Sequence, residues 1–218
     1  MIKIVIFDLD GTLADTMDGL AYSGNFIAKK YGLKLRDRAF YERAIGNGAK
    51  AFIRCLAKDQ NTSEKKLDEM SDAFLVNYNG NWNVGLRVYD GMKKVVSALK
   101  RQDIVVAINT NKPQTMTDKV VPYLFEENTF FDVKGACDAY NKKPDPQGVK
   151  LILDKAEMKP SECIYIGDSI VDINTAKNAG VKSIGVPWGY GKNSDIKNAT
   201  YFAKKADQIL EIIAALNG

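Results

Sequence analysis

Two aspartates separated by a single residue follow a short apolar run near the start of the sequence. Asp8 and Asp10 end this run, and Gly11 comes next. A carboxylate can attack phosphorus and form an aspartyl-phosphate, which splits hydrolysis into two easier transfers. A turn after the strand would bring the Asp10 side chain near the leaving-group oxygen, where it can protonate the leaving alcohol and later activate water. The spacing therefore predicts phosphoryl transfer, with Asp8 as the nucleophile and Asp10 as the acid and base.

A carboxylate that attacks an anionic phosphoryl group needs a cation between the two groups. Magnesium with oxygen ligands is the usual solution, and Asp8 and Asp168, each at the end of an expected strand, can supply two of the ligands. Histidine is absent from the sequence, which removes the commonest general base and the commonest metal ligand. Acid-base and metal chemistry must therefore fall to carboxylates, and Mg²⁺ is the expected cofactor.

Further polar residues could hold the transferring group. Thr110 and Asn111 offer a hydroxyl and an amide to the phosphoryl oxygens, and Lys143 offers a point charge. Gly11 fits a turn in which the backbone passes close to a phosphate and successive amides cradle the anion. Asp172 would face the same way as Asp168 if a helix begins at about Ser169.

Each of these residues also has an ordinary structural interpretation. An aspartate at a strand end is commonly a turn former or a helix cap, and Thr110 and Ser169 could be caps as well. Lys143 alone would be a surface lysine, and Asp172 a first-turn acid that opposes the helix dipole. The catalytic interpretation depends on finding all of these residues in one chain.

The elements that must position these residues alternate in type along most of the chain. Short apolar runs predict strands at 3–8, 104–109, 131–133, 164–166 and 183–186, and helical periodicity predicts helices at 92–100, 114–124, 146–155, 170–179 and 206–216. Alternating strands and helices indicate an α/β fold with a parallel sheet covered on both faces. Ligands bind at the carboxyl ends of such strands, which would gather Asp8, Asp10, Thr110 and Asp168 in one crevice.

Residues 16–85 interrupt this alternation. They form helix-compatible segments at 20–31, 39–44, 49–58 and 64–78, without a convincing strand. We expect an inserted helical cap at 16–85, a core formed by 1–15 and 86–218, and linkers at 15–18 and 77–85. Most of the net charge of +4 falls in the insert, which suits either a lid over an anionic substrate or a solvated charged face.

Composition narrows the class of protein. With 218 residues, 45% of them hydrophobic, the chain can bury a full core, and its longest apolar runs are too short to cross a bilayer. Cys55, Cys137 and Cys163 lack metal-type spacing, so we expect thiols in a reducing compartment, the cytoplasm. No basic run with interleaved aromatics indicates a nucleic-acid surface. The expected partner is a small phosphorylated metabolite, with no membrane or nucleic acid, and the chain is expected to be a monomer or homodimer.

Four motifs together resemble those of the haloacid dehalogenase superfamily in order and spacing. They are Asp8-x-Asp10-Gly-Thr-Leu-x-Asp15-Thr16, Thr110-Asn-Lys-Pro, Lys143-Pro-x-Pro and Gly167-Asp168-Ser-x-x-Asp172. The insert is placed like the helical cap of the superfamily's first subclass. The second and third motifs look most like those of its phosphoglycolate phosphatase branch.

This resemblance implies a Rossmann-like parallel sheet of order 5-4-1-2-3, flanked by helices. It implies that Asp8 is nucleophile and metal ligand, that Asp10 is acid-base residue and ligand through its backbone carbonyl, and that Asp168 is the third protein ligand. Thr110 and Lys143 would hold the phosphoryl group. Asp172 would support Lys143 or a metal-bound water.

The resemblance also bears on activity. It implies a magnesium-dependent phosphatase that hydrolyses a small monoester such as phosphoglycolate through an aspartyl-phosphate. Dehalogenases of the superfamily lack the second aspartate of the first motif and phosphonate hydrolases carry alanine there, so Asp10 favours phosphate ester chemistry. A β-phosphoglucomutase-like phosphomutase, a pyrophosphatase or nucleotidase of the same superfamily, and a non-catalytic protein that binds a phosphorylated metabolite remain alternatives.

Substrate choice would lie in the insert. Residues 45–50 resemble the cap loop that reaches the active site in the phosphoglycolate phosphatase and phosphoglucomutase branches, and Lys50 could meet a substrate carboxylate. The alternative is that Gly46 and Gly48 only end one helix before the next.

Overall fold

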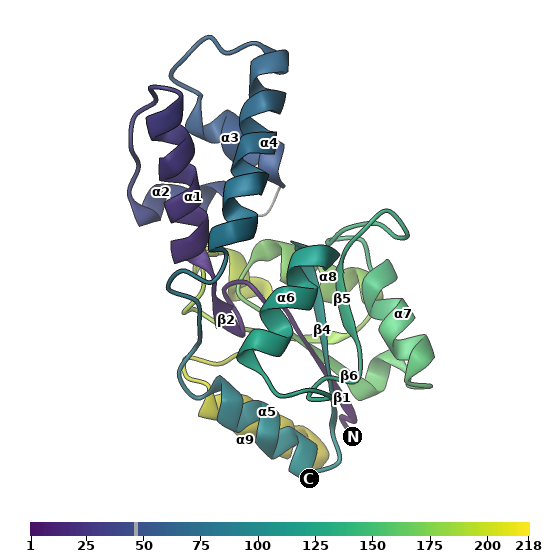
Figure 1. The fold of residues 1–218 in the computed structure, drawn as a ribbon. Coiled ribbons are helices and arrows are strands. Elements are labelled where there is room, and N and C mark those ends of the chain that lie inside the picture. Colours follow the sequence, from purple (N-terminus) through teal and green to yellow (C-terminus); the bar gives the residue numbers. More distant parts are fainter. Residues whose placement is uncertain (46–47) are drawn as a thin grey trace. The chain divides into compact units, whose positions relative to one another are not determined.

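The computed structural model of the chain describes residues 1–45 and 48–218 (Figure 1). The chain divides into two compact units, one formed by Met1–Ala14 and Val88–Gly218 and the other by Asp15–Arg87. Within the described residues, no helix is both long enough and apolar enough to cross a bilayer. The two units are described in turn.

The larger unit is built on a six-stranded sheet. Its strands are β1 (Ile4–Phe7), β4 (Val105–Pro113), β5 (Val133–Ala136), β6 (Cys163–Gly167), β7 (Lys182–Gly185) and β8 (Tyr201–Phe202). They lie in the order β5-β4-β1-β6-β7-β8, and β1 pairs in parallel with β4 and β6. The five expected strands thus lie in the expected order 5-4-1-2-3. The two-residue strand β8, which is too short to show a pattern in the sequence, extends the edge beside β7.

Helices cover both faces of this sheet (Figure 1). They are α5 (Met92–Arg101), α6 (Gln114–Leu124), α7 (Gln147–Lys155), α8 (Ile170–Ala179) and α9 (Asp207–Asn217), with short 3₁₀ turns at Pro160–Glu162 and Asp195–Asn198. Helices α7 and α8 pack on the face that carries Ile4, Ile6 and Tyr165, and α5, α6 and α9 lie on the opposite face. The central strand β1 is fully buried, as its run of apolar residues requires in a sheet covered on two faces.

Two strands, β4 and β5, differ from their expected bounds by more than one residue. Strand β4 continues through Pro113, so the segment 110–113, expected as a loop, is strand. The reason is that β4 outlasts β1 and keeps pairing with β5, where Pro113 lies beside Ala136 after an irregularity in register. Strand β5 itself begins at Val133 rather than at Phe131.

The smaller unit is all helical in its interior. It contains α1 (Met17–Lys30), α2 (Arg38–Ala44), α3 (Ala49–Leu56) and α4 (Glu64–Asn81). A row of aromatic rings fills its core. Phe52 stacks on Tyr41 with ring centroids 5.3 Å apart and lies tilted against Phe74 at 4.8 Å, and Phe74 stacks on Tyr78 at 5.8 Å. Such pairs contribute beyond the area that they bury.

Both expected linkers are partly regular structure. The segment 15–18 contains the end of strand β2 (Ala14–Asp15) and the start of α1, and the segment 77–85 is helical through Asn81. Burial of Tyr78 keeps the last turns of α4 in place. The chain leaves the smaller unit at β3 (Arg87–Val88), which pairs with β2.

Ion pairs fix the base of the smaller unit. Asp15 is buried and accepts from Arg38 at 2.6 Å and from Arg87. Arg38 also reaches Asp18 at 2.5 Å. The two chain segments that enter and leave this unit are therefore held together by shared carboxylates.

The close contact between α1 and α2 gives a stability prediction. A methyl group on Gly24 would overlap the ring of buried Tyr41, whereas a methyl on Gly80 in α4 meets no described atom within 4 Å. We expect Gly24→Ala to lower the free energy of unfolding by about 1–3 kcal/mol through overpacking. Gly80→Ala should raise it, by up to about 1 kcal/mol, because alanine restricts the unfolded chain and favours helix. Denaturant unfolding of both variants measures the difference, and equal stability of the two would contradict this account.

Candidate active site

A buried lysine joins two aspartates at the carboxyl edge of the sheet. Asp8 directly follows β1, and its amide donates to the carbonyl of Ile166 in β6 at 2.9 Å. Lys143 Nζ lies 2.7 Å from Asp8 Oδ1 and 2.6 Å from Asp172 Oδ1. All three side chains are buried. The structure thus brings together the expected nucleophile, the expected phosphate-binding lysine and the lysine's expected support.

Asp172 is held by the helix that carries it. Its Oδ2 accepts from the amide of Ser169 at 3.0 Å and from the Ser169 hydroxyl at 2.6 Å, and Ser169 in turn caps α8. Both carboxylate oxygens of Asp172 are therefore engaged, one by Lys143 and one by Ser169. This arrangement supports Lys143 and agrees with the first of the two roles that the sequence left open for Asp172.

Asp168 is surrounded by donors that the sequence analysis did not identify. Its Oδ1 accepts from the hydroxyl of buried Thr12 at 3.0 Å, and its Oδ2 accepts from the amides of Tyr190 and Gly191 at 2.8 and 3.0 Å. The loop after β7 therefore wraps this carboxylate. The sequence signal for it was the run Gly189-Tyr190-Gly191, because side chains on either glycine would overlap Asp168.

Gly11 is required by the same carboxylate. Its φ is +90°, and a Cβ there would lie 2.7 Å from both carboxylate oxygens of Asp168, so glycine is the residue that fits. The amide of Gly11 donates to the carbonyl of Ala14, and those of Leu13 and Ala14 donate to the carbonyl of Leu9. These bonds close the turn on itself. The expected cradle of amides around a phosphate stays a prediction.

Asn111 binds the backbone of Lys143, whereas the sequence predicted that its amide would bind the phosphoryl oxygens. Its Oδ1 accepts from the Lys143 amide at 2.8 Å, and its Nδ2 donates to the Lys143 carbonyl at 3.0 Å. The side-chain amide therefore anchors the backbone of Lys143 rather than facing the phosphoryl oxygens. Thr110 is buried, and its Oγ1 accepts from the amide of Lys112 at 3.2 Å. This bond leaves the hydroxyl proton of Thr110 to donate elsewhere.

Asp10 has a lysine partner that the sequence analysis missed. Lys112 Nζ lies 3.1 Å from Asp10 Oδ1 and 3.2 Å from Asp10 Oδ2. The Lys112 side chain is only 3% exposed, and that of Asp10 is 15% exposed. The signal was the position of Lys112 two residues after Thr110, which places both on the same side of a strand.

Burial and mutual repulsion set the charges of the site. Burial raises the pKa of Asp8 to about 8, with Asp172 and Asp168 raising it and Lys143 opposing them. Burial also raises the pKa of Asp168 to about 6, with Asp172 adding to the effect. Burial alone would lower the pKa of Lys143, but Asp172 and Asp8 outweigh it and hold that pKa well above its usual value. Lys143 therefore stays charged, and its single positive charge offsets only part of the repulsion among the carboxylates.

The donor set fits a hard divalent cation. Ligand atoms of Asp8, Asp168 and Asp172 all lie within 4.8 Å of one another. Asp8 and Asp168 are the ligands that the sequence predicts, and the structure places Asp172 beside them, with its oxygens also accepting from Lys143 and Ser169. Carboxylate oxygens without sulfur or imidazole suit Mg²⁺, Ca²⁺ or Mn²⁺.

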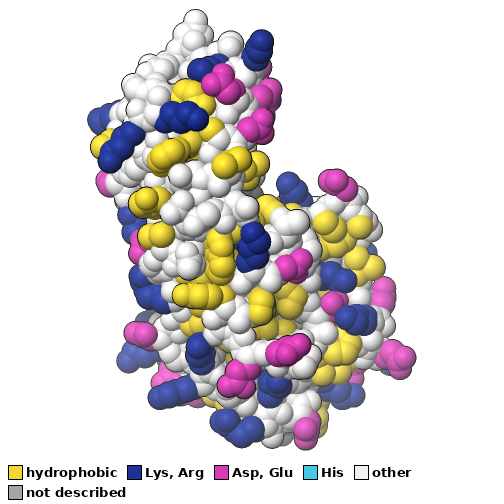
Figure 2. Space-filling view, viewed as in Figure 1, with side chains coloured by type: hydrophobic (Ala, Val, Ile, Leu, Met, Phe, Trp, Pro, Cys, Tyr) yellow, Lys and Arg dark blue, Asp and Glu magenta, His cyan; other side chains and the backbone are white. Residues whose placement is uncertain are grey.

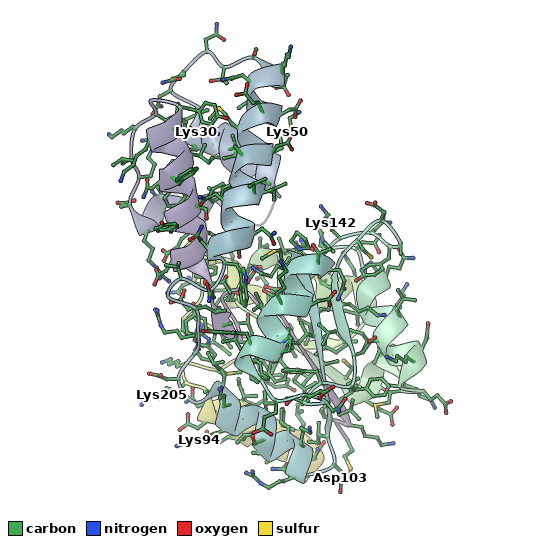
Figure 3. The ribbon with its side chains drawn as sticks, in the orientation of Figure 1. Lys30, Lys50, Lys94, Asp103, Lys142 and Lys205 are labelled. Atoms are coloured by element: carbon green, nitrogen blue, oxygen red, sulfur yellow. The ribbon has the colours of Figure 1, made fainter. Side chains whose placement is uncertain are left out.

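Lys50 lies in the helical unit, on α3, beside α4 (Figure 3). Its ammonium pairs with Asp68 at 2.5 Å and with Glu64 at 3.2 Å, and the side chain is 43% exposed. The preceding loop, through which Lys50 was expected to reach a substrate, includes residues 46–47, which lie outside the described residues.

An α/β sheet with an inserted helical unit and a buried cluster of aspartates around one lysine defines an enzyme that acts at the carboxyl edge of its sheet. A family model for haloacid dehalogenase-like hydrolases matches residues 5–186, and the chain belongs to this family. The resemblance of the four motifs is thereby confirmed.

Curated relatives and solved structures agree with this family. The chain is 31% identical to a phosphoglycolate phosphatase of Vibrio parahaemolyticus, over 98% of this chain and 96% of the relative. It is 30% identical to one of Vibrio cholerae, over 97% of each chain. The crystal structure of a predicted phosphoglycolate phosphatase from Haemophilus somnus matches with a TM-score of 0.90 and 26% identity, over 97% of this chain and 98% of that one. These matches support a phosphatase activity, and phosphatases of this family generally use a metal ion.

The raised carboxyl pKa values give a prediction for the metal-free protein. Asp8 keeps its proton in the folded state up to about pH 8, whereas its ordinary pKa is 3.8. The folded protein therefore binds more protons than the unfolded chain, so its stability falls as the pH rises through that interval. Unfolding free energies in chelating buffer should decline from about pH 5 to about pH 8. Asp8→Asn should flatten the decline, and a wild-type stability that rose across this range would contradict the electrostatics.

Proposed function

We propose that this protein is a magnesium-dependent phosphatase that hydrolyses a small phosphate monoester, such as phosphoglycolate, through an aspartyl-phosphate on Asp8. The observation that carries the proposal is the position of Asp8, buried at the end of the central strand beside Lys143 and Asp168. The phosphatase class rests on the family and on the named activity of the relatives. The choice of phosphoglycolate rests on those relatives' names alone.

In the proposed first step, an oxygen of Asp8 attacks phosphorus while the bond to the leaving oxygen breaks. Asp10 gives its proton to the leaving alcohol. Lys143 and the hydroxyl of Thr110 neutralise charge on the phosphoryl oxygens, where fixed donors in a buried site are most effective. Bound Mg²⁺, held by Asp8, by Asp168 and by the backbone carbonyl of Asp10, would supply positive charge between the nucleophile and the phosphoryl group.

In the proposed second step, Asp10 takes a proton from water, and the water oxygen attacks phosphorus. The bond to Asp8 breaks and inorganic phosphate leaves. Asp172 takes no part in bond making, because its two oxygens hold Lys143 and Ser169. It keeps the ammonium of Lys143 pointed at Asp8 throughout both steps.

A phosphomutase would share the first step and differ in the acceptor, which would be a sugar hydroxyl rather than water. Incubation with a hexose phosphate separates the two reactions by product. Free phosphate supports the hydrolase, and an isomeric sugar phosphate supports the mutase. A panel of phosphoglycolate, sugar phosphates, nucleotides and pyrophosphate then ranks the substrates.

We propose that the substrate is a small molecule. We also propose that the protein works in a reducing compartment, the cytoplasm. Cys55, Cys137 and Cys163 are free thiols. On the face shown in Figure 2, basic and acidic side chains are interspersed rather than gathered into one basic field. Such a mixture lacks the basic stripe typical of nucleic-acid binding.

The covalent mechanism predicts the effect of removing the nucleophile. Asp8→Asn keeps the volume and one oxygen for Lys143 but cannot form a stable ester with phosphorus. We expect it to abolish magnesium-dependent phosphate release, with an intact circular dichroism spectrum. The wild type should lose activity on chelation and regain it with Mg²⁺. Turnover by Asp8→Asn above about one hundredth of the wild-type rate would exclude a covalent role for Asp8.

Lys50 is the proposed contact for the substrate carboxylate. Contact would require its ammonium to exchange Asp68 and Glu64 for the substrate. Lys50→Ala should lower kcat/KM for phosphoglycolate and leave carboxylate-free substrates unaffected. Lys66→Ala is the matched control, because Lys66 is also exposed and paired with a carboxylate, Glu69, in the same unit. Unchanged kinetics for every substrate in Lys50→Ala would remove Lys50 from the site.

A further inference from the structure

The proposed acid-base residue shares its carboxylate with a buried ammonium. Lys112 Nζ is nearly equidistant from the two oxygens of Asp10, at 3.1 and 3.2 Å. Asp8 accepts from Lys143 and Asp168 accepts from Thr12, and Asp10 likewise accepts from a buried side chain at this edge of the sheet. A lysine that is only 3% exposed would be costly to bury without such a carboxylate.

The strand register places this lysine. Phe7 of β1 lies beside Ile108 of β4 in the last pair between these strands, and β4 continues beyond it to Pro113. Alternation along the strand puts Thr110 and Lys112 on one side, and the intervening Asn111 turns to the backbone of Lys143. Strand β4 therefore places the Thr110 hydroxyl and the Lys112 ammonium at the site, and its Asn111 holds the loop that carries Lys143.

The backbone of Lys112 is also fixed. Its amide donates to Thr110 Oγ1 at 3.2 Å, and its carbonyl accepts from Thr117 Oγ1 at 3.3 Å. A Cβ on Gly135 of β5 would lie 2.9 Å from this carbonyl, so the neighbouring strand passes close against it. The backbone that carries the Lys112 ammonium is therefore held rigidly, as is required of a residue that orients another group.

We propose that Lys112 is a positioning residue for Asp10, which fixes the orientation of the acid-base carboxylate. The inference rests on the proposed function. Proton donation to the leaving alcohol requires the Asp10 carboxyl to face the leaving oxygen, and Lys112 Nζ contacts both oxygens of that carboxyl. Loss of this contact would therefore slow the first step most where the leaving group needs a proton.

This assignment makes a prediction about leaving groups. Phenyl phosphate releases a basic phenolate that needs a proton, whereas p-nitrophenyl phosphate releases a stable anion that leaves without one. The two substrates have nearly the same shape, and both lack a carboxylate. In Lys112→Met, we expect kcat/KM for phenyl phosphate to fall by at least about tenfold and that for p-nitrophenyl phosphate to change by less than about threefold.

Asp10 variants test whether Lys112 acts through Asp10. Asp10→Asn should show the same leaving-group selectivity to a greater degree. Adding Lys112→Met to Asp10→Asn should cause little further loss, because residues that act as a unit are not additive. Lys155→Met is the matched control, since Lys155 pairs with Asp132 at 3.0 Å at an exposed position. It should leave both substrates unaffected.

Folding is checked independently by circular dichroism and thermal melting. Should Lys112→Met fail to fold, Lys112→Gln carries the same comparison, because its side chain is one atom shorter and loses the contact of Lys112 Nζ with both oxygens of Asp10. Equal losses for the two aryl substrates, or no loss for either, would overturn the inference. A loss confined to phosphoglycolate would also overturn it, and would make Lys112 a contact for the substrate carboxylate. A wild type that hydrolyses none of these esters would instead refute the proposed function.

Discussion

Three buried aspartate side chains cluster at the carboxyl edge of the sheet, and two of them, Asp8 and Asp172, share the ammonium of Lys143. With Asp8, Asp168 and Asp172 ionised, their three negative charges exceed the one positive charge of Lys143 by two. This excess is costly in a buried site, and it is the charge that one divalent cation would balance. The turn at Gly11, the loop around Asp168 and the cap of α8 all serve to keep these groups close despite their repulsion.

The sheet makes this crowding possible because it distributes the groups over separate strands. Asp8 follows β1, Asp168 follows β6, and Lys143 comes from the loop after β5, where Asn111 of β4 holds it. Each group is fixed by its own backbone, so the repulsion cannot be relieved by a small local shift. Instead, burial and this repulsion raise the pKa of Asp8 to about 8 and the pKa of Asp168 to about 6.

Residues at strand ends could be placed from the sequence, because apolar runs followed by polar turns locate the carboxyl edge. Asp8 and Asp168 were found in this way, and Lys143 came from the motif Lys143-Pro-x-Pro. The spacing of Lys112 from Thr110 shows its side of the strand, but the carboxylate partners of Thr12 and Lys112 could not be predicted, because they are distant in the sequence. Strand β8 and the extension of β4 to Pro113 depend on neighbouring strands rather than on local pattern, which is why they too were missed.

The paired hydrogen bonds between Asn111 and the backbone of Lys143 have a consequence for the length of the loop that carries this lysine. The lysine is anchored from β4, and the carbonyl of Pro144 behind it accepts from Asn178 of α8 at 2.9 Å. Lys143 is therefore held by two elements that are separate from the segment between Cys137 and Lys142. A change of length in that segment would leave both of these anchors in place, so we expect an exposed loop to tolerate it more readily than β4 or α8 would.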